Sequence, residues 1–297
     1  MPTFRRLACL PLTLCLAAQA PRPALDVLPD KALGFILFRD PLLSQVKLQG
    51  LMQRLKQKKD DPLTEAQKTF GLPRLPPGRQ GMALVFLEDG GANAKGPLQL
   101  AYLSPTDAKG YLETLKATSK DGKLWSYETQ GKHFAAAMKD GWVILGPEGA
   151  KAQVRRLSET VSPLRKEAGS LGAWMEGGEA FGMVTPKGLW TFFHDAKKAL
   201  GGPSQAEQAD PFMAKAEREL DLVALQGRLD ADGNLVLSVR ARLNPRGEWM
   251  AMGRDLPLAD GLGIASLPRL DYQAAAGGNL PSEWLQAIGS LGTESLY

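Results

Sequence analysis

KLWSYETQGKHFAAAMKDGWVILG, residues Lys123–Gly146, is the stretch that decides the fold of this chain. Its apolar residues fall into three short segments rich in aromatic and aliphatic side chains, separated by two-residue turns. The second turn is Asp140-Gly141, and Asp-Gly between apolar segments is among the strongest short signals for a β-hairpin. The stretch therefore predicts an antiparallel meander of three strands: Lys123–Thr129, Lys132–Lys139 and Gly141–Gly146.

On the N-terminal side of the meander, strands alternate with helices that begin at a capping residue followed by proline. Asp40-Pro41 predicts a helix to about Lys59, and Asp61-Pro62 predicts a shorter one that Gly71 ends. Ser104-Pro105 predicts the cap of a third helix. Strands are expected at Ala32–Arg39, Gly81–Glu88 and Pro97–Ser104.

The C-terminal side repeats this style. Helices are expected at Glu148–Glu159, Pro186–Leu200 and Pro211–Glu219, and strands at Ala180–Thr185, Asp221–Leu229 and Leu235–Leu243. Hairpins interrupted by helices predict the α+β class, with a mostly antiparallel sheet and helices packed on it.

The predicted organisation is a leader over residues 1–20 and one α+β domain over 26–256, with candidate sub-lobes 26–160 and 178–256. Residues 260–297 allow two interpretations. Leu267-Pro268, an apolar stretch and then Asn279 and Pro281 echo the order of Leu28-Pro29, the first strand, Asp40 and Pro41. This tail is either the final strand and helix of the domain or the start of a second, truncated repeat.

The first twenty residues have the layout of a secretory signal peptide. Arg5 and Arg6 precede an apolar stretch, and Ala18-Gln19-Ala20 is a small-x-small ending. The apolar stretch is too short to cross a bilayer as a helix, so we expect cleavage and no transmembrane segment in the mature chain. The predicted cleavage residues are Ala18 and Ala20. Because Pro21 hinders a cut after Ala20, a cut after Ala18 or nearer Ala24 stays open.

Removal of this leader changes what the composition implies. Both cysteines, Cys9 and Cys15, would be lost, so no disulfide is available to the mature chain. Lipidation of Cys15 is disfavoured, because Leu14 stands where lipoprotein signals need a small residue. The leader holds two arginines and no acid, so the net charge falls from +4 to +2. A nucleic-acid partner therefore has no support from charge.

The candidate catalytic side chains do not form a recognisable constellation. His133 lies in the middle strand of the meander, and His194 lies on a helix beside Asp195. Helix neighbours point about 100° apart, so these two residues are not a dyad by spacing. Glu128, Glu176 and Glu179 stay candidates for a dispersed acid pair of the kind that glycoside hydrolysis uses. No catalytic residue is predicted, and the binding residues are unknown at this stage.

Metal and nucleotide motifs are also missing from the sequence. Residues 230–234 resemble the start of a calcium loop, but a strand pattern follows them. Residues 261–266 begin like a dinucleotide loop, but Ser266 replaces the third glycine. We expect no metal site and no cofactor. The six tryptophans predict core packing, with a carbohydrate-stacking platform as the alternative.

The leader, the strand and helix that follow Leu28-Pro29, the Asp140-Gly141-Trp142 hairpin and the restart at Leu267-Pro268 together resemble a family. It is the family of large exported bacterial proteins built from repeated α+β units, known only as a domain of unknown function. The resemblance implies a periplasmic or extracellular location and no established activity.

Our hypothesis from the sequence is a non-enzymatic protein with a binding or scaffolding role toward an envelope or extracellular partner. The alternatives are a secreted hydrolase with dispersed acidic residues and a carrier of a hydrophobic ligand. An open apolar sheet face favours binding. Two facing carboxyls in a deep cleft favour the hydrolase, and a large apolar cavity favours the carrier.

Overall fold

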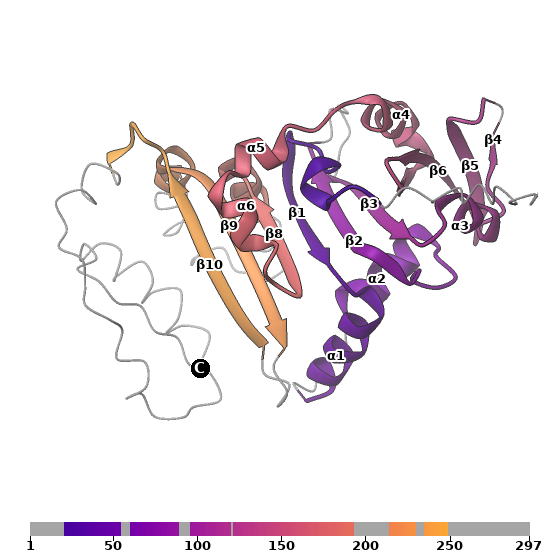
Figure 1. Cartoon of the computed structure of the whole chain (residues 1–297), viewed down its shortest axis with the longest axis horizontal. Coiled ribbons are helices and arrows are strands. Elements are labelled where there is room, and N and C mark those ends of the chain that lie inside the picture. The colour runs from indigo at the N-terminus through magenta and orange to yellow at the C-terminus, as the bar shows by residue number, and fades with distance from the viewer. Residues whose placement is uncertain are drawn as a thin grey trace, which may run out of the picture.

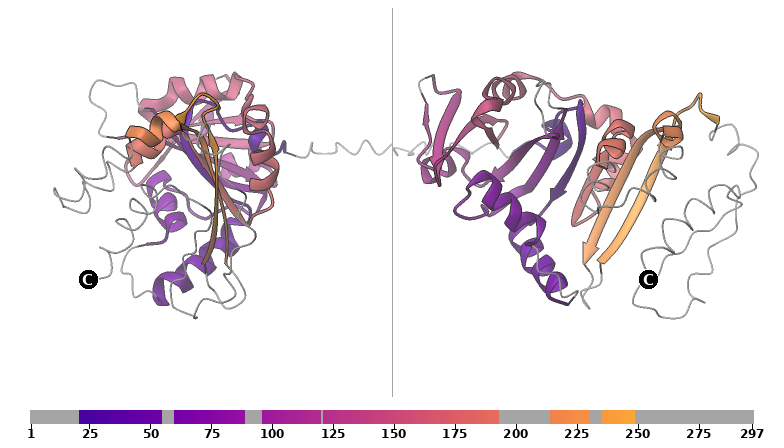
Figure 2. Two further views of the ribbon diagram at one scale, coloured as in Figure 1. Left: turned by 90° about the vertical axis from the view of Figure 1, so that its left-hand side faces the viewer. Right: turned by 180° about the vertical axis from the view of Figure 1, so that it is seen from behind.

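The computed structural model describes residues 21–54, 60–88, 96–119, 121–192, 214–229 and 235–248. Ten strands in these ranges form one antiparallel sheet in the order β10-β9-β8-β1-β2-β3-β7-β6-β5-β4. Figure 1 shows them side by side from β10 on the left to β4 on the right, and Figure 2 shows helices on both sides of the sheet. The predicted α+β class with a mostly antiparallel sheet is confirmed.

The strands are β1 (Ala32–Phe38), β2 (Gly78–Leu87), β3 (Leu98–Pro105), β4 (Thr118–Ser119), β5 (Leu124–Thr129), β6 (Lys132–Lys139), β7 (Trp142–Pro147), β8 (Ala180–Val184), β9 (Leu220–Leu229) and β10 (Leu235–Leu243). The helices are α1 (Pro41–Arg54), α2 (Pro62–Phe70), α3 (Ala108–Thr114), α4 (Lys151–Glu159), α5 (Leu164–Ala168) and α6 (Ser170–Met175), with short 3₁₀ helices η1 (Ala24–Asp26) and η2 (Glu148–Ala150). Residues 186–192 and 214–219 are also helical.

The meander forms as predicted, in strands β5, β6 and β7. Both turns carry positive φ at both central residues, with 51° and 71° at Gln130-Gly131 and 49° and 83° at Asp140-Gly141. This left-handed pair is the turn whose twist matches that of an antiparallel hairpin. The turn residues therefore set the register of the three strands.

The predicted start and end of α2 are confirmed. The Asp61 side chain accepts hydrogen bonds of 3.0 Å from the backbone N–H groups of Leu63 and Thr64. Gly71 ends the helix in the left-handed conformation, with φ at 59°. A capping carboxylate satisfies backbone donors that have no partner inside the helix, and glycine adopts this end conformation without strain.

One detail of the helix predictions was wrong. Ser104 and Pro105 do not cap a helix, because they belong to the end of β3; the cap of α3 is Asp107, which accepts from the backbone N–H of Gly110 at 3.0 Å. On α1, Leu42 is 43% and Val46 is 67% exposed. The sequence pattern also gave no sign of the short elements β4, α5 and α6.

The sheet has a separate core on each side, and we name the sides face A and face B. On face A, Phe35 and Leu37 of β1 share a core with the segment before β1 and with helices α4, α5 and α6. On face B, Phe38 of β1 and Leu84 of β2 share a core with α2 and α3. Since successive strand residues point to opposite faces, each central strand is apolar on both sides.

The strand order is symmetric about the antiparallel pair of β1 and β8. A two-fold rotation normal to the sheet at this pair relates β1, β2 and β3 to β8, β9 and β10. The helix starts correspond as well. Asp40 accepts from the backbone N–H of Leu43 at 2.9 Å after β1, and Thr185 accepts from that of Gly188 at 3.1 Å after β8. The unit of strand, capped helix and hairpin therefore occurs twice.

Several sequence-based predictions concern residues outside the described part of the chain. They are the leader at 1–20, the tail at 260–297 with its echo of the first strand, His194, the loops 230–234 and 261–266, Trp249 and Trp284. Within the described part, the strands from 26–160 and from 178–256 belong to the same sheet.

Candidate functional site: the apolar face of strands β9 and β10

Strand β10 has one polar side and one apolar side. Its sequence, LVLSVRARL, alternates strictly through the segment Ser238–Arg242. Ser238, Arg240 and Arg242 pair with Gln226, Ala224 and Leu222 of β9, and the latter two belong to the face A core. The polar side therefore lies on face A, and Val239 and Ala241 lie on face B.

The polar side of β10 is engaged with α5 and α6. The Arg240 guanidinium stacks over the ring of Trp174, with 4.7 Å to the ring centroid. Arg242 donates a hydrogen bond to the carboxylate of Asp221 and another of 2.6 Å to the carbonyl of Glu167. Charged groups at this surface thus have partners, and the arginine stems cover part of the sheet.

The apolar side of β10 is open. Val239 is 61% exposed and Ala241 is also exposed, while their cross-strand neighbours Leu225 and Val223 on β9 are half-buried. We call these four residues the β9–β10 apolar face. In most half-buried strands the apolar side is the buried one, whereas in β10 Val239 and Ala241 are exposed, as are the polar Ser238 and Arg240 on the other side.

The outer edge of β10 adds a second feature to the same place. Strand β3, which corresponds to β10 by the two-fold relation, is bordered by β7 through the pairs Ala101↔Leu145, Tyr102↔Ile144 and Leu103↔Val143. Among the described strands, β10 has no neighbour on that side. An edge strand with unpaired main-chain groups is a template on which another strand can form hydrogen bonds.

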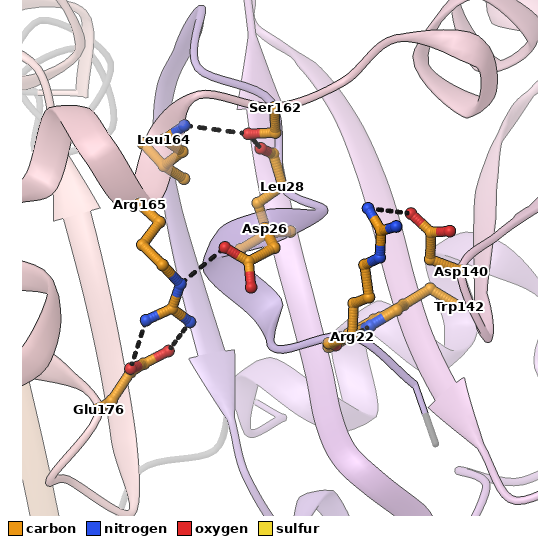
Figure 3. A network of polar contacts seen from close by, with 9 residues as sticks. All are labelled: Arg22, Asp26, Leu28, Asp140, Trp142, Ser162, Leu164, Arg165 and Glu176. Carbon is orange, nitrogen blue, oxygen red and sulfur yellow. Dashed lines mark hydrogen bonds and ion pairs between the residues drawn. The ribbon is translucent and has the colours of Figure 1, made fainter. Parts of the chain in front are cut away.

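The other notable polar feature is a cavity of about 410 Å³ on face A, between η1 and α6. Two carboxylates line it, but both bind one guanidinium. Arg165 donates to Asp26 at 2.6 Å and to the two oxygens of Glu176 at 2.7 and 3.1 Å, as Figure 3 shows. The hydrogen bonds that Arg165 donates to Glu176, and to a smaller extent the one to Asp26, raise the pKa of Arg165. A carboxylate held in such a pair is poorly suited to donate a proton as a general acid.

The three acids that the sequence offered as candidates for a dispersed pair each lie beside a basic residue or a histidine. Glu176 and Glu179 also line one cavity of about 420 Å³ beside α1, together with Asp40. Glu128 lies 3.7 Å from Nδ1 of His133, and both side chains are exposed on the β5–β6 hairpin. Glu179 pairs with Lys47 of α1 at 2.8 Å, and Glu176 pairs with Arg165. In the described ranges, no three metal-ligating side chains come together.

Trp142, Trp125 and Trp174 have packing roles. Trp142 is fully buried on β7, and Trp125 and Trp174 pack against the cores on faces B and A. Trp190 is half-buried on the helical segment 186–192. None of the helices in the described ranges has the length and hydropathy that a membrane crossing requires.

The β9–β10 apolar face was not predicted from the sequence. The signal was present in the alternation of Ser238–Arg242, which separates the two sides of the strand. The alternation does not show which of the two sides the helices cover. That information depends on where α5 and α6 pack, and these two helices were themselves missed.

Comparison with protein-family models, with characterised proteins and with solved structures gave no match to this chain.

Proposed function

We propose that this chain is an exported, non-enzymatic binding protein, and that its partner docks on the β9–β10 apolar face. Export rests on the signal-peptide layout of residues 1–20. Binding rests on the exposed apolar side of β10. An open apolar sheet surface next to an unpaired edge is typical of a protein–protein contact.

The single observation that carries the proposal is the 61% exposure of Val239 in the centre of β10, beside half-buried Leu225. At the corresponding place in the other half of the sheet, Ala101 and Leu84 are buried by α2 and α3. Full burial of a valine side chain is worth about 1.5–3 kcal/mol, so covering this face would contribute directly to affinity.

The outer edge of β10, which no other described strand borders, indicates the chemistry of the partner. We propose an extended segment of another envelope protein that adds a strand to β10, with alternate apolar side chains over Val239 and Ala241. Main-chain hydrogen bonds would provide affinity in this mode, and the alternating side chains would provide specificity. β7, which is buried on both faces beside β3, illustrates the kind of strand that such an edge accepts.

The test places a photoreactive amino acid at position 239 in the full chain, expressed in its native host. We expect cleaved, exported protein that gives one discrete cross-linked adduct, and loss of this adduct when Ala241→Asp is added. Position 161 is the matched control, because Val161 is 80% exposed and lies between α4 and α5, away from this face.

Adducts that are the same from positions 239 and 161 would contradict the binding proposal, as would an adduct that Ala241→Asp leaves unchanged. A cross-link from position 239 only to another part of the same chain would contradict the proposal, because it would mean that the chain's own residues cover this face. A lipid recovered in place of a protein would favour the carrier. Uncleaved protein in the cytoplasm would contradict export.

A further inference from the structure

The cavity of about 410 Å³ between η1 and α6 lies on face A, on the other side of the sheet from the β9–β10 apolar face. It is located at one end of three central strands. Leu37 lines it near the end of β1, Gln80 near the start of β2 and Phe181 near the start of β8. Cavities of roughly 300 to 1,000 Å³ are the usual sites for small molecules. This cavity is therefore large enough to hold one.

One wall of the cavity is formed by residues 21–28, which cross face A before β1 and contribute Asp26 to the lining. Leu25 and Val27 of this segment have no exposed surface and belong to the face A core. Lys139 of β6 donates to the carbonyl of Val27 at 3.0 Å and holds the segment in place. Because this wall is part of the core, a ligand would not have to order it on binding.

The carboxylates of the cavity carry one negative charge more than their cation neutralises. Arg165 is shared by Asp26 and Glu176, as Figure 3 shows. Both carboxylate oxygens of Glu176 accept from Arg165, whereas Oδ2 of Asp26 accepts no hydrogen bond from the described residues. This oxygen is therefore available to a cationic donor.

Arg39 brings a positive charge to the same cavity. Its Nε donates to the carbonyl of Gly178 at 2.9 Å, and its Nη2 donates to the carbonyl of Glu176. The guanidinium lies over the ring of Phe181, with 5.7 Å to the ring centroid. Among the described residues, no carboxylate forms an ion pair with Arg39, and its Nη1 has no acceptor. A guanidinium that is fixed by neutral groups in this way is available to a carboxylate.

We propose that this cavity binds an α-amino acid with an apolar side chain. The ammonium group of the ligand donates to Oδ2 of Asp26, and its carboxylate accepts from Nη1 of Arg39. The side-chain amide of Gln80, which has no hydrogen-bond partner in the described ranges, donates to the same carboxylate. Leu37 and Phe181 provide apolar surface. A zwitterion matches the excess negative charge and the unpaired positive charge together, so no net charge enters the cavity.

The test is calorimetric titration of the full chain with L-leucine and with two analogues. Isocaproate lacks the ammonium group of leucine, and isoamylamine lacks its carboxylate. We expect one molecule of L-leucine per chain, and roughly tenfold weaker binding or less for each analogue, since each loses one charged hydrogen bond. Equal affinity for L-leucine and either analogue would overturn the proposal, as would no binding of L-leucine. Neither result bears on the partner proposed for the β9–β10 apolar face.

Two variants test which residue binds which end of the ligand. Asp26→Asn should weaken L-leucine binding roughly tenfold or more without weakening isocaproate binding, whereas Arg39→Gln should weaken both. Arg155→Gln is the matched control, because Arg155 is an α4 arginine that pairs with Asp121 and Glu159 outside this cavity. It should leave L-leucine binding unchanged. Unchanged binding in both cavity variants, or an equal loss in the control, would overturn the proposal.

A third variant, Gln80→Ala, keeps the proposal testable if the charge variants do not fold. The Gln80 side chain has no hydrogen bond within the described part of the chain, so the unfolding temperature should change by less than about 2 °C. L-Leucine binding should weaken about 2- to 10-fold, which corresponds to the loss of one hydrogen bond. Unchanged affinity in this folded variant would mean that L-leucine does not bind here and would overturn the proposal.

Discussion

The two halves of the sheet contain the same unit but differ in what covers face B. In the first half, Ala101 of β3 and Leu84 of β2 are 0% and 4% exposed beneath α2 and α3. In the second half, Val239 of β10, the counterpart of Ala101, is 61% exposed. Equivalent strand pairing in the two halves therefore does not determine how deeply a side chain is buried, because burial depends on the layer packed against the strands.

The two halves of the sheet also differ on face A, where the first half has an apolar core and β10 has polar side chains. Tyr102 of β3 is fully buried there, while its counterpart Arg240 on β10 is exposed and stacks on Trp174. The first half thus has a core on both sides, and β10 has a polar contact on face A and an open apolar surface on face B. This asymmetry is the basis of our proposal that a partner docks on the second copy.

The largest expected effect comes from an aspartate at the two corresponding face B positions. Ala101→Asp should cost more than about 4 kcal/mol, because it buries a charge with no partner. Val239→Asp should cost less than about 1 kcal/mol, because its side chain remains in solvent. Urea unfolding of both purified variants measures the difference. Similar losses would mean that the two face B positions are equally buried in solution.

A smaller difference is expected when leucine is shortened at the two corresponding positions of β2 and β9. Leu84→Ala should cost about 3 kcal/mol, since it leaves a cavity in a closed core. Leu225→Ala should cost about 1 kcal/mol, because the half-buried side chain already contacts water. The free energies of unfolding from urea titration test this ratio. A larger loss at Leu225 than at Leu84 would reverse the comparison.

The smallest expected effects concern face A. The Tyr102 hydroxyl is buried and has no hydrogen-bond partner in the described part of the chain, and burial raises its pKa. Tyr102→Phe should therefore increase stability by about 1 kcal/mol, because it removes an unsatisfied polar group. Arg240→Ala should reduce stability by about 0.5–1 kcal/mol through loss of the stacking on Trp174. Thermal unfolding at one pH measures both, and a destabilised Tyr102→Phe protein would reveal a partner for the hydroxyl.

Local signals made most of the fold predictable. The Asp-Gly turn, the Asp61-Pro62 helix start and the apolar strands β1, β8, β9 and β10 were recognisable because turn chemistry and side-chain periodicity act over a few residues. The short helices α5 and α6 were missed, because their N-cap residues, Pro163 and Gly169, make no capping bond. The only side-chain signal in the described residues around these starts is Ser162, which accepts from the N–H of Leu164 at 3.2 Å. The Ser104-Pro105 pair resembles a helix cap and therefore misled the prediction. These residues instead extend β3, where Pro105 pairs with Gly78 of β2.

The candidate site was less accessible to sequence reasoning than the fold. The sequence directed attention to histidines and acids. In the described part, Glu176 pairs with Arg165, Glu179 pairs with Lys47, and Glu128 lies beside His133. The alternation of β10 was visible in the sequence, but it is compatible with burial of either side of the strand. Only the positions of α5 and α6 show that its apolar side is the open one.

The amino-acid sequence by itself determined the α+β class and the meander, because these depend on composition and on contacts between near neighbours. The tertiary structure decided which side of β10 is exposed, that Pro21–Leu28 is a core element, and that β1 and β8 lie together at the centre of the sheet. These features join residues far apart in the chain, such as Arg242 and Glu167, 75 positions apart, and Lys139 and Val27, 112 positions apart. Such contacts form only when the whole chain packs, and no local pattern encodes them.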